Sequence, residues 1–199
     1  TKNGIIKKTC LEAYSRPRAN GVNAINILEG DQVVGVRLTN GHNELLLANR
    51  NGRAIRFNEA ELRPMGRVST GVRGMRLDGG DDEVVGLVCV NDPQTETIMV
   101  VSENGYGKRS DVDDYRKTAR GAKGVKTISI TEKTGRLVAI KVVTDENDLM
   151  IINKSGILIR MKVADVRVMG RATQGVRLIN LTKKNDVIAS VCKVMTETE

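Results

Sequence analysis

The sequence predicts an all-β fold, a propeller-like array of about four repeated four-stranded units in which the first unit is incomplete. Three observations predict it: a repeat of about fifty residues, short aliphatic runs that end at Asn-Gly or Ser-Gly turns, and no convincing 3.6-residue periodicity. We expect one domain over residues 1–199, with repeats at approximately 1–42, 43–93, 94–145 and 146–195.

The repeat is defined by two independent markers. The first is a turn before a short strand, at Asn3-Gly4, Asn51-Gly52, Asn104-Gly105 and Ser155-Gly156, with the glycines 48, 53 and 51 residues apart. The second is a Gly-Val pair at Gly21, Gly71, Gly124 and Gly175, with steps of 50, 53 and 51 residues. Because both markers keep nearly the same period, coincidence is improbable and the chain is an array of similar units.

Each unit contains four strand-like segments. An aliphatic run precedes the turn at 44–48, 97–101 and 148–153, and a short alternating strand that ends in a basic residue follows it. A polar connection of about ten residues then leads to a Gly-Val strand at 71–77, 124–130 and 175–181. A last aliphatic strand closes the unit at 33–38, 84–90, 137–143 and 187–194.

The first unit has no aliphatic run before its turn, since only Thr1 and Lys2 precede Asn3. We therefore expect that a preceding strand is missing and that a sheet edge is exposed near the N-terminus, unless the C-terminal segment pairs with that edge.

Composition narrows the function. Lys and Arg number 32 against 24 Asp and Glu, a net charge of +8 that favours an anionic partner. Three Tyr, one Phe and no Trp argue against single-strand readers that stack bases on aromatic rings. One histidine and three cysteines without CxxC spacing leave little for zinc ligation or a catalytic triad, and they indicate reduced thiols in a cytosolic protein. No stretch approaches the length of a membrane span.

Basic residues recur in register with the markers. Four residues after the turn glycine stand Lys8, Arg56, Arg109 and Arg160. Four before the Gly-Val glycine stand Arg67, Arg120 and Arg171, with Arg18 one residue out of register. Eight before it stand Arg63, Arg116 and Arg167, and two after it stand Arg73, Lys126 and Arg177. Neighbouring candidates are Lys7, Arg16, Lys108 and Lys123. Repetition about an axis turns each position into an arc of positive charge, as expected of a surface that follows a phosphate backbone.

An alternative reading stays open for each of these positions. A basic residue at a strand end can protect an edge or pair with Asp or Glu of the neighbouring unit. The acids gather in turns at 78–83 and 111–114, which makes neutralisation of the whole set less plausible. A second functional class is a basic propeller that serves as a protein-interaction platform for an acidic partner.

The loops before each Gly-Val pair combine small residues with arginine, at 16–21, 65–71, 119–124 and 169–175. Small residues allow a polyanion to approach the backbone closely, and arginine offers a planar donor fork suited to phosphate. The alternative interpretation is that each loop is only a flexible connection, whose glycines are needed because the backbone has a positive φ there.

Three motifs carry a family resemblance: Arg63-Pro-Met-Gly-Arg67, Gly105-Tyr-Gly-Lys-Arg109 and the run 169–176. With the repeats, they resemble the C-terminal domains of DNA gyrase A subunits, whose nearest relatives are those of the topoisomerase IV C subunit. The resemblance covers nearly the whole chain. It implies a β-pinwheel, a propeller variant whose blades exchange strands, which binds, bends and wraps duplex DNA around its basic perimeter.

The same resemblance implies the wider role and its limits. Wrapping would position DNA for ATP-dependent negative supercoiling by the full type IIA topoisomerase, in the bacterial cytoplasm at the nucleoid. The partners would be duplex DNA, the remainder of the gyrase A subunit, and the gyrase B subunit. Neither cofactor, metal nor membrane is implied. The chain alone is expected to be non-catalytic, since Tyr14, Tyr106 and Tyr115 match no part of the catalytic tyrosine motif.

Two departures from the family pattern matter. The family's domain normally has six blades, and the match covers about the last four. Its signature box, Gln-Arg-Arg-Gly-Gly-Lys-Gly, is not intact; Thr118–Gly124 comes nearest and keeps four of seven positions. We therefore expect binding and bending of DNA with an incomplete wrap.

Overall fold

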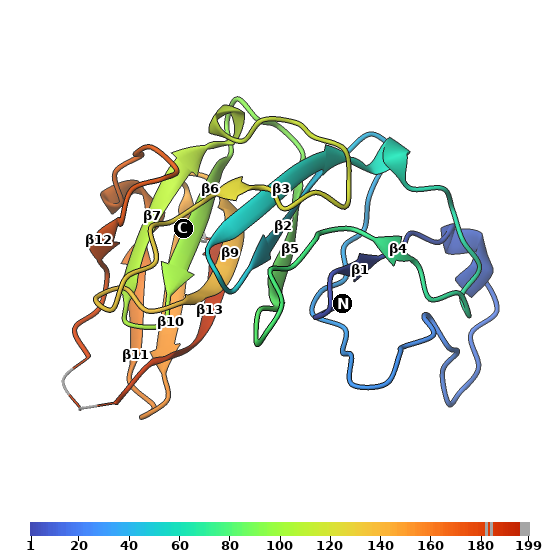
Figure 1. Cartoon of the computed structure of the whole chain (residues 1–199), viewed down its shortest axis with the longest axis horizontal. Helices are drawn as coiled ribbons and strands as arrows, with labels where there is room; N and C mark the ends of the chain where they lie inside the picture. Colours follow the sequence, from blue (N-terminus) through green and yellow to red (C-terminus); the bar gives the residue numbers. More distant parts are fainter. Residues whose placement is uncertain (182, 184, 196–199) are drawn as a thin grey trace.

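The structure is a computed structural model that describes residues 1–181, 183 and 185–195 (Figure 1). Within these residues it contains thirteen β-strands in four sheets and four short 3₁₀ helices. The predicted all-β class is confirmed.

Two sheets have four strands each. One has the order β5-β2-β3-β8 and is built from β2 (Glu44–Asn49), β3 (Arg53–Asn58), β5 (Val84–Val90) and β8 (Val125–Lys126). The other has the order β12-β7-β6-β9 and is built from β6 (Thr97–Ser102), β7 (Tyr106–Asp111), β9 (Leu137–Val143) and β12 (Val176–Arg177). All their strand pairs are antiparallel, as the hairpin turns require.

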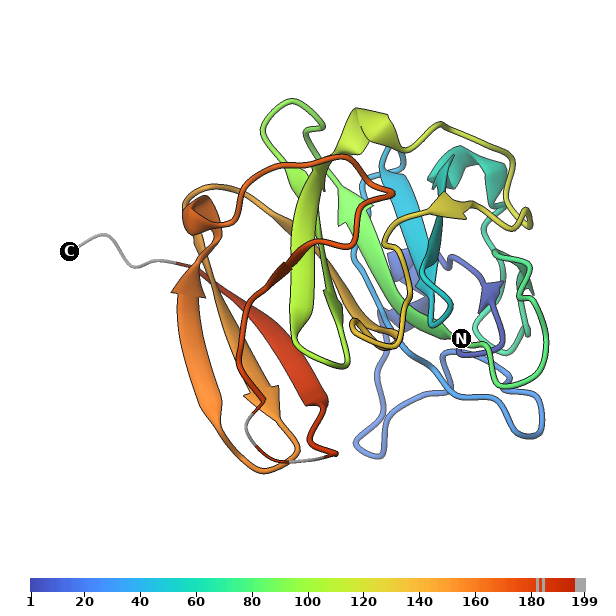
Figure 2. The same cartoon turned by 60° about the vertical axis from the view of Figure 1, so that its left-hand side comes forward.

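The two remaining sheets are smaller and lie at the ends of an arch (Figure 1). β1 (Ile5–Ile6) pairs with β4 (Val72–Arg73) at one end. At the other end, β10 (Asn147–Asn153) lies between β11 (Leu158–Lys162) and β13 (Ile188–Met195). Figure 2 shows this last sheet face on, with the N-terminal unit on the opposite side of the molecule.

Strands are exchanged between units, as the resemblance to a β-pinwheel implied. β4, β8 and β12 each come from the unit that follows the sheet they join. Each Gly-Val strand therefore forms the outer edge of the preceding sheet. On the inner side, β5 contacts β9 and β9 contacts β13.

The Gly-Val strands are shorter than predicted, with two residues each in place of the expected 71–77, 124–130 and 175–181. After two residues the chain bends across the hairpin turn of the preceding unit. The carbonyl of Gly52 accepts hydrogen bonds from the amides of Thr127 (2.8 Å) and Ile128 (3.4 Å), and the carbonyls of Gly4 and Gly105 accept equivalent pairs. This bend carries Met75, Ile128 and Ile179 into the core.

Both glycine markers have a steric reason. Gly52 has a φ of 81°, and a Cβ there would lie 3.0 Å from the carbonyl oxygen of Ile128. Gly124 has a φ of 77°, and a Cβ there would collide with the carbonyl of Ala54 in β3, the strand with which β8 pairs. The repeat is visible in the sequence because strand exchange demands glycine at both places.

Three hydrophobic cores lie between successive sheets. Leu46 and Val88 of one sheet pack with Ile98 and Ile140 of the next, for example. A central sheet is thus covered on both faces, which explains why β2 and β6 are buried along nearly their whole length. A strand buried on both faces reads as a continuous aliphatic run rather than as an alternating one.

The first unit departs from the prediction. Residues 33–38, expected to form its last strand, make no regular strand, and their apolar side chains are exposed, with Val36 at 78% and Leu38 at 75%. The reason is the missing neighbour: among the described residues, β1 pairs only with β4, so no strand lies between β1 and 33–38. The expected exposed edge at the N-terminus is confirmed.

Four 3₁₀ helices open the polar connections: η1 (Leu11–Tyr14), η2 (Glu59–Glu61), η3 (Val112–Asp114) and η4 (Val163–Asp165). In the part of the chain that the structure describes, none of the helices has the length and apolar character needed to cross a bilayer. The described residues also contain no group of three or more His, Cys, Asp or Glu side chains placed to hold a metal ion.

Candidate nucleic-acid interface

In the two middle units, the basic residue four positions after the turn glycine points into the protein. Arg56 is 4% exposed and donates from Nη1 to the carbonyl oxygens of Val112 (2.8 Å) and Tyr115 (2.9 Å), at the two ends of η3. Arg109, also buried, donates from Nε to the carbonyl of Val166 (2.6 Å) after η4. These guanidiniums therefore join each sheet to the 3₁₀ helix of the next unit.

Acids complete these inward sites. Arg56 forms ion pairs with Glu44 and with Asp113 (3.3 Å), and Arg109 forms one with Asp145 (2.6 Å). The alternative reading, pairing within the protein, thus applies to the candidates Arg56 and Arg109.

Lys8 and Arg160 occupy the same register at the two ends of the array. Lys8 is half-buried and donates from Nζ to the carbonyl of Glu59 (2.9 Å). The Arg160 side chain is 54% exposed and pairs with Asp148 (2.7 Å) on its own sheet. Lys8 therefore joins units as Arg56 and Arg109 do, whereas Arg160 keeps a solvent-facing surface.

Lys108 and Lys7, three residues after their turn glycines, hold the loop of the following unit. Lys108 is fully buried, and its Nζ donates to the carbonyls of Gly170 (2.7 Å) and Arg171 and to Thr173 Oγ1 (3.3 Å). Lys7 Nζ donates to the carbonyls of Gly66 (2.7 Å), Arg67 (2.8 Å) and Ser69 (3.2 Å). Each ammonium spends its three donors on one loop, so neither is placed to meet a phosphate.

Burial affects the protonation of both lysines. It lowers the pKa of Lys108 to about 7, with a further decrease from the charge of Arg171 and an opposing increase from Asp114. Burial also lowers the pKa of Lys7. The equivalent position in the second unit is Ile55, which is buried and apolar, so the place itself belongs to the interior.

The loop arginines make a repeated contact across the unit boundaries. Nη1 of Arg120 donates to the carbonyl of Arg73 (3.1 Å), and Nη1 of Arg171 donates to the carbonyl of Lys126 (2.8 Å). Arg67 makes the equivalent bond to the carbonyl of Asn23 (3.1 Å). Each acceptor is the second residue after a Gly-Val glycine, so one geometry is repeated three times, and each of the three arginines stays partly exposed.

Backbone hydrogen bonds fix each loop on the preceding unit as well. The amide of Gly121 donates to the carbonyl of Gly74 (2.7 Å), and the amide of Arg76 donates to the carbonyl of Ala122 (3.0 Å). Ser129 donates to Thr173 (3.1 Å) at the next boundary. The Gly-rich loops therefore follow one another along the outer edge formed by β4, β8 and β12.

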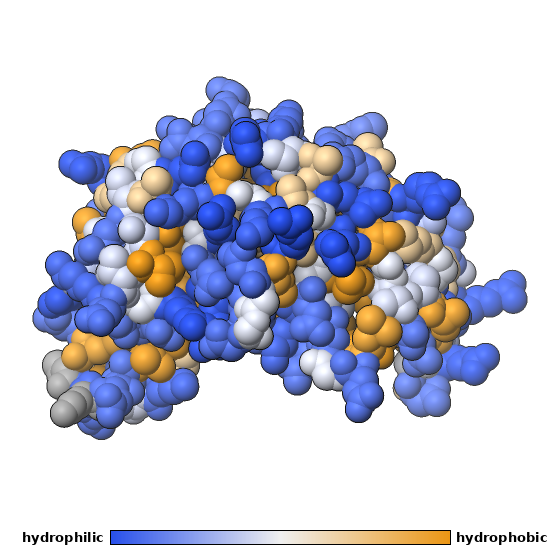
Figure 3. Space-filling model, in the orientation of Figure 1, coloured by the Kyte–Doolittle hydropathy of each residue, from blue (hydrophilic) through white to orange (hydrophobic). Residues whose placement is uncertain are grey.

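The remaining candidates point outward. Seven of them are exposed and make no side-chain hydrogen bond or ion pair with any residue that the structure describes: Arg16, Arg18, Arg63, Arg73, Arg116, Lys126 and Arg167. The position eight before the Gly-Val glycine is complete among them, and the position two after it is represented by Arg73 and Lys126. The face seen in Figure 3 is accordingly mostly hydrophilic, with apolar residues in small separate groups.

Besides Arg160, two exposed candidates have partners. Lys123 Nζ lies 2.6 Å from Asp78 Oδ1, and this contact holds the pKa of Asp78 below its usual value. Arg177 stacks over Tyr106, with its guanidinium carbon 5.5 Å from the ring centroid, and donates from Nη2 to the phenolic oxygen (3.0 Å). Both cations stay at the surface, and only Lys123 has a competing carboxylate.

The sequence reasoning missed Arg76, which is exposed and bonded through its amide to the loop that carries Arg120. Its equivalents are Ser129 and Asn180, so recurrence in register could not reveal it. The signal available was its spacing of three residues from Arg73, since both follow the same Gly-Val pair.

Fold and site together define a class of protein: a repeat protein of the propeller type whose outer edge carries a series of unpaired cations. The family model described as the DNA gyrase C-terminal domain, beta-propeller, matches residues 1–40, 43–91, 96–144 and 147–192. The chain belongs to this family.

Relatives and solved structures agree with that assignment. The DNA gyrase A subunit of Staphylococcus aureus (strain NCTC 8325 / PS 47) is 46% identical over 199 residues, which cover the whole of this chain and 22% of the relative. The chain thus spans about a fifth of the relative's length.

Among solved structures, the C-terminal domain of DNA topoisomerase IV superposes with a TM-score of 0.90 at 31% identity, covering 98% of this chain and 60% of the other. A DNA gyrase A C-terminal domain superposes with a TM-score of 0.85 at 26% identity, covering 98% and 64%.

Proposed function

We propose that this chain is a non-catalytic module that binds, bends and wraps duplex DNA for a type IIA topoisomerase of the gyrase kind. The observation that carries the proposal is the row of unpaired cations at equivalent positions of successive units, above all Arg63, Arg116 and Arg167. Cations in the protein interior serve packing, whereas these have no other described partner. Neutralisation of phosphates by such residues supplies most of sequence-independent affinity for DNA.

The sheets and the loops between them follow an arch (Figure 1). A duplex that follows the outer edge would meet the loops in turn and would have to bend to reach them all. Bending a duplex over a short site costs on the order of 1–6 kcal/mol, which several phosphate contacts can offset. Since glycines and small residues occupy the loops, the backbone can approach the phosphates closely.

The proposed contact set is smaller than the set of basic candidates. It comprises the exposed residues Arg16, Arg18, Arg63, Arg73, Arg116, Lys123, Lys126, Arg160, Arg167 and Arg177, together with the accessible edges of Arg67, Arg120 and Arg171. Lys7, Lys8, Arg56, Lys108 and Arg109 are assigned instead to joining the units.

In the whole protein, this module would deliver a DNA segment to the strand-passing parts of the gyrase A subunit. Together with the gyrase B subunit, those parts would carry out ATP-dependent negative supercoiling in the bacterial cytoplasm. We also propose that the repeats 1–42, 43–93, 94–145 and 146–195 act together as one domain. The incomplete counterpart of the signature box at Thr118–Gly124 favours a partial wrap.

A topology footprint tests the proposal. The 199-residue chain is incubated with relaxed closed plasmid and topoisomerase I, or with nicked plasmid and a ligase. The protein is then removed and the linking number of the closed plasmid is analysed. We expect a shift of the topoisomer distribution that grows with protein concentration at low salt. Binding without any shift would reject wrapping, and no binding at low salt would reject the DNA partner altogether.

The alternative function, a platform for an acidic partner protein, makes the opposite prediction about DNA binding by the 199-residue chain. A partner protein captured by this chain would survive nuclease treatment, and duplex DNA would not be retarded at low salt. No described feature favours that alternative over the DNA partner.

A further inference from the structure

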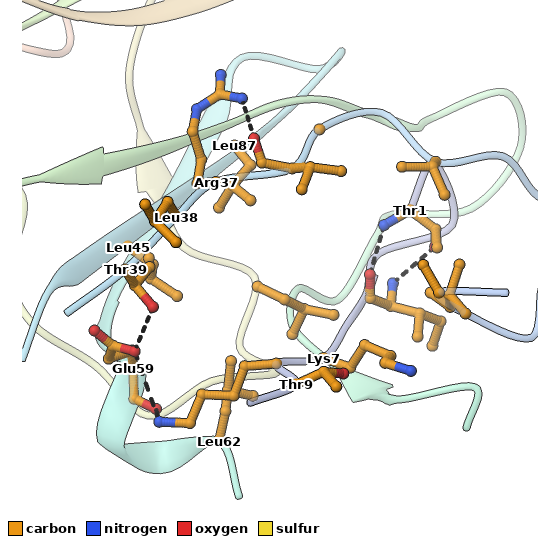
Figure 4. Close-up of a pocket in the computed structure, with 18 of the residues that line it drawn as sticks. Thr1, Lys7, Thr9, Arg37, Leu38, Thr39, Leu45, Glu59, Leu62 and Leu87 are labelled. Carbon is orange, nitrogen blue, oxygen red and sulfur yellow. Dashed lines mark hydrogen bonds and ion pairs between the residues drawn. The ribbon is translucent and has the colours of Figure 1, made fainter. Parts of the chain in front are cut away.

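A cavity of about 200 Å³ lies on the inner side of the array, at the sheet edges opposite to the Gly-Val strands. It is enclosed by Val34 and Arg37 together with the inner strands β5, β9 and β13, so all four units contribute to it. Figure 4 shows the larger aliphatic hollow beside β1, at whose border Arg37 lies with its guanidinium pointing away from that hollow. We call the smaller space the inner cavity.

Small residues bring the inner strands together around this cavity. Gly35, Gly86, Ala139 and Ser190 occupy one repeated position, with steps of 51, 53 and 51 residues, and the last three line the cavity. A Cβ on Gly86 would lie 2.7 Å from Cγ2 of Ile140, so the close approach of β5 to β9 requires a residue without a side chain there. The inner cavity is therefore a product of the repeat.

Three cations from three units converge at the inner cavity. Arg37 and Lys141 each stand two residues after the small position, and both line the cavity. Lys193 of β13 reaches across to β9, where its Nζ donates to the carbonyl of Val142 (3.1 Å). Positive charge is thus brought to one place from residues far apart in the sequence.

The pKa of Lys141 reflects this crowding. Burial lowers the pKa of Lys141, and the charge of Arg37 lowers it further. Cys192 opposes this decrease, and the charge of Lys193 adds to it. The cations are therefore close enough to disfavour one another's charged state.

No acid of the cavity wall balances these charges. Among the described residues that line the inner cavity, none is Asp or Glu. The side chain of Lys141 is half-buried and makes no hydrogen bond or ion pair with any residue that the structure describes. Arg37 donates from Nη1 to the carbonyl of its neighbour Val36 (2.7 Å), which leaves most of its five donors for another partner. A partly desolvated cation without a counter-charge is unfavourable, so an anion from solution would relieve it.

We propose that the inner cavity is a binding site for a small multivalent oxyanion of the phosphate type, taken from solution. Arg37 offers its planar donor fork to two oxygens, and Lys141 and Lys193 act as point charges. The hydroxyl of Ser190, which lines the cavity, supplies a further donor. The volume is below the range of about 300–1,000 Å³ that is usual for sites of drug-sized ligands, so inorganic phosphate or pyrophosphate fits better than a whole nucleotide.

The bound anion also affects stability. It contacts side chains of three units at once, and a ligand that binds only the folded state raises the free energy of unfolding. The inner cavity lies at the edges formed by β5, β9 and β13, whereas the proposed DNA contacts lie at the opposite edges, formed by β4, β8 and β12. The inference therefore stands apart from the DNA-binding proposal, and either can fail without the other.

Titration calorimetry with inorganic pyrophosphate tests the site on the 199-residue chain in a low-chloride buffer. We expect one saturable site per chain, and Lys141→Met should weaken binding at least about tenfold because it removes the half-buried charge. Lys154→Met, at an exposed lysine that does not line the cavity, is the matched control and should leave the affinity unchanged. Arg37→Gln, at an exposed side chain, should also weaken binding and provides the same test if Lys141→Met folds poorly. Absence of saturable binding, or equal effects of the variants and the control, would overturn the site.

The exposed arginines of the outer edge supply the competing explanation, because they also attract phosphate. A triple variant with Arg63, Arg116 and Arg167 replaced by glutamine separates the two places. If the triple variant loses pyrophosphate binding and Lys141→Met keeps it, the anion lies on the outer edge and the proposal is wrong. The reverse result supports the inner cavity.

Two further measurements locate the anion and identify its source. Pyrophosphate should slow amide exchange in residues 138–141 and 189–191, and slowing confined to other residues would contradict the site. ATP carries the same phosphate chemistry on a larger molecule, so it should bind more weakly than pyrophosphate. Equal affinity for ATP would contradict the assignment to a free anion.

Discussion

The ammonium of Lys108 donates a hydrogen bond of 2.7 Å to the carbonyl oxygen of Gly170, in the loop of the following unit. Lys7 makes the same contact with Gly66 (2.7 Å), so the relationship is a repeated feature of the array. Under the proposed function, such a lysine would serve the DNA interface without touching DNA, by shaping a loop that carries an arginine.

Replacement of Lys108 with methionine should weaken DNA binding through the loop alone. The apolar Ile55 at the equivalent place indicates that methionine can be accommodated. Reordering of one side chain on binding costs about 0.5–1.5 kcal/mol, so we expect a roughly 2- to 12-fold loss of affinity. The slope of log K against log[salt] should stay unchanged, because no phosphate contact is removed.

The control for Lys108→Met is Lys126→Met, at the exposed end of the same boundary. Loss of a phosphate contact there should reduce the salt slope by about one. Binding titrations at four or more salt concentrations distinguish the two effects. If Lys108→Met changes the slope as much as Lys126→Met does, Lys108 contacts phosphate and its structural assignment fails.

The pH dependence of stability should also depend on Lys108. Its pKa is about 7 in the folded protein and near 10.5 when unfolded, so the unfolded chain binds more protons between these values. The free energy of unfolding therefore rises with pH in this window, by up to about 1.4 kcal/mol per pH unit from this residue. Urea unfolding from pH 7.5 to 9.5 should show a steeper rise in the parent chain than in Lys108→Met. Parallel curves would contradict the lowered pKa.

Substitution of Arg56 should mainly lower stability, whereas substitution of Arg63 should mainly weaken DNA binding. Removal of one partner of a buried ion pair costs about 3–5 kcal/mol, so Arg56→Met should lower the unfolding free energy by an amount of that order. Arg63→Met, at an exposed side chain without described partners, should change stability by less than about 0.5 kcal/mol and should weaken DNA binding. Denaturant unfolding and DNA titration of both variants provide the check. If Arg63→Met lowered stability and Arg56→Met weakened only DNA binding, the two assignments would be wrong.

Gly124 should be intolerant of alanine because of strand exchange. Its φ of 77° is strained for a side chain, and a Cβ would collide with Ala54 of β3, the strand that β8 joins. Such strain costs about 1–3 kcal/mol, and the collision adds to it. Gly66→Ala is the control, because a Cβ there meets nothing within 4 Å and the φ is ordinary. Thermal unfolding should show a large drop for Gly124→Ala only. Equal melting temperatures would argue against the close approach of Gly124 to β3.

The fold was largely predictable because exchange leaves its mark on the sequence. Glycine is needed both at the turn and at the start of the Gly-Val strand that packs on it. The spacing of these glycines in the sequence indicates the period and the number of units. The length of the Gly-Val strands was not predictable, since the bend at Thr127 and Ile128 depends on the carbonyl of Gly52 in another unit. Residues 33–38 have the composition of a strand but lack a neighbour, which a local pattern does not reveal. The repeat boundaries themselves stay a prediction.

For the site, register identified the basic positions but not their direction. Arg56 and Arg63 look alike in the sequence, yet one meets the carbonyls of Val112 and Tyr115 and the other faces solvent. One clue was available: Lys7 and Lys108 share their position with Ile55, and a place that accepts isoleucine belongs to the interior. The hydrogen-bond acceptors of the buried basic residues are mostly backbone carbonyls of the next unit. Every residue has such a carbonyl, so the sequence does not indicate which of them will accept a hydrogen bond.

The central claim is that DNA affinity resides in the outward cations of the repeated register, and the salt dependence of binding tests it most directly. With the seven unpaired outward cations engaged, the slope of log K against log[salt] for a duplex of about 40 base pairs should be roughly −6. Replacement of Arg63, Arg116 and Arg167 together with glutamine should reduce that slope to about −4 while stability is retained. A slope near zero in the parent chain, or an unchanged slope in the triple variant, would contradict the account.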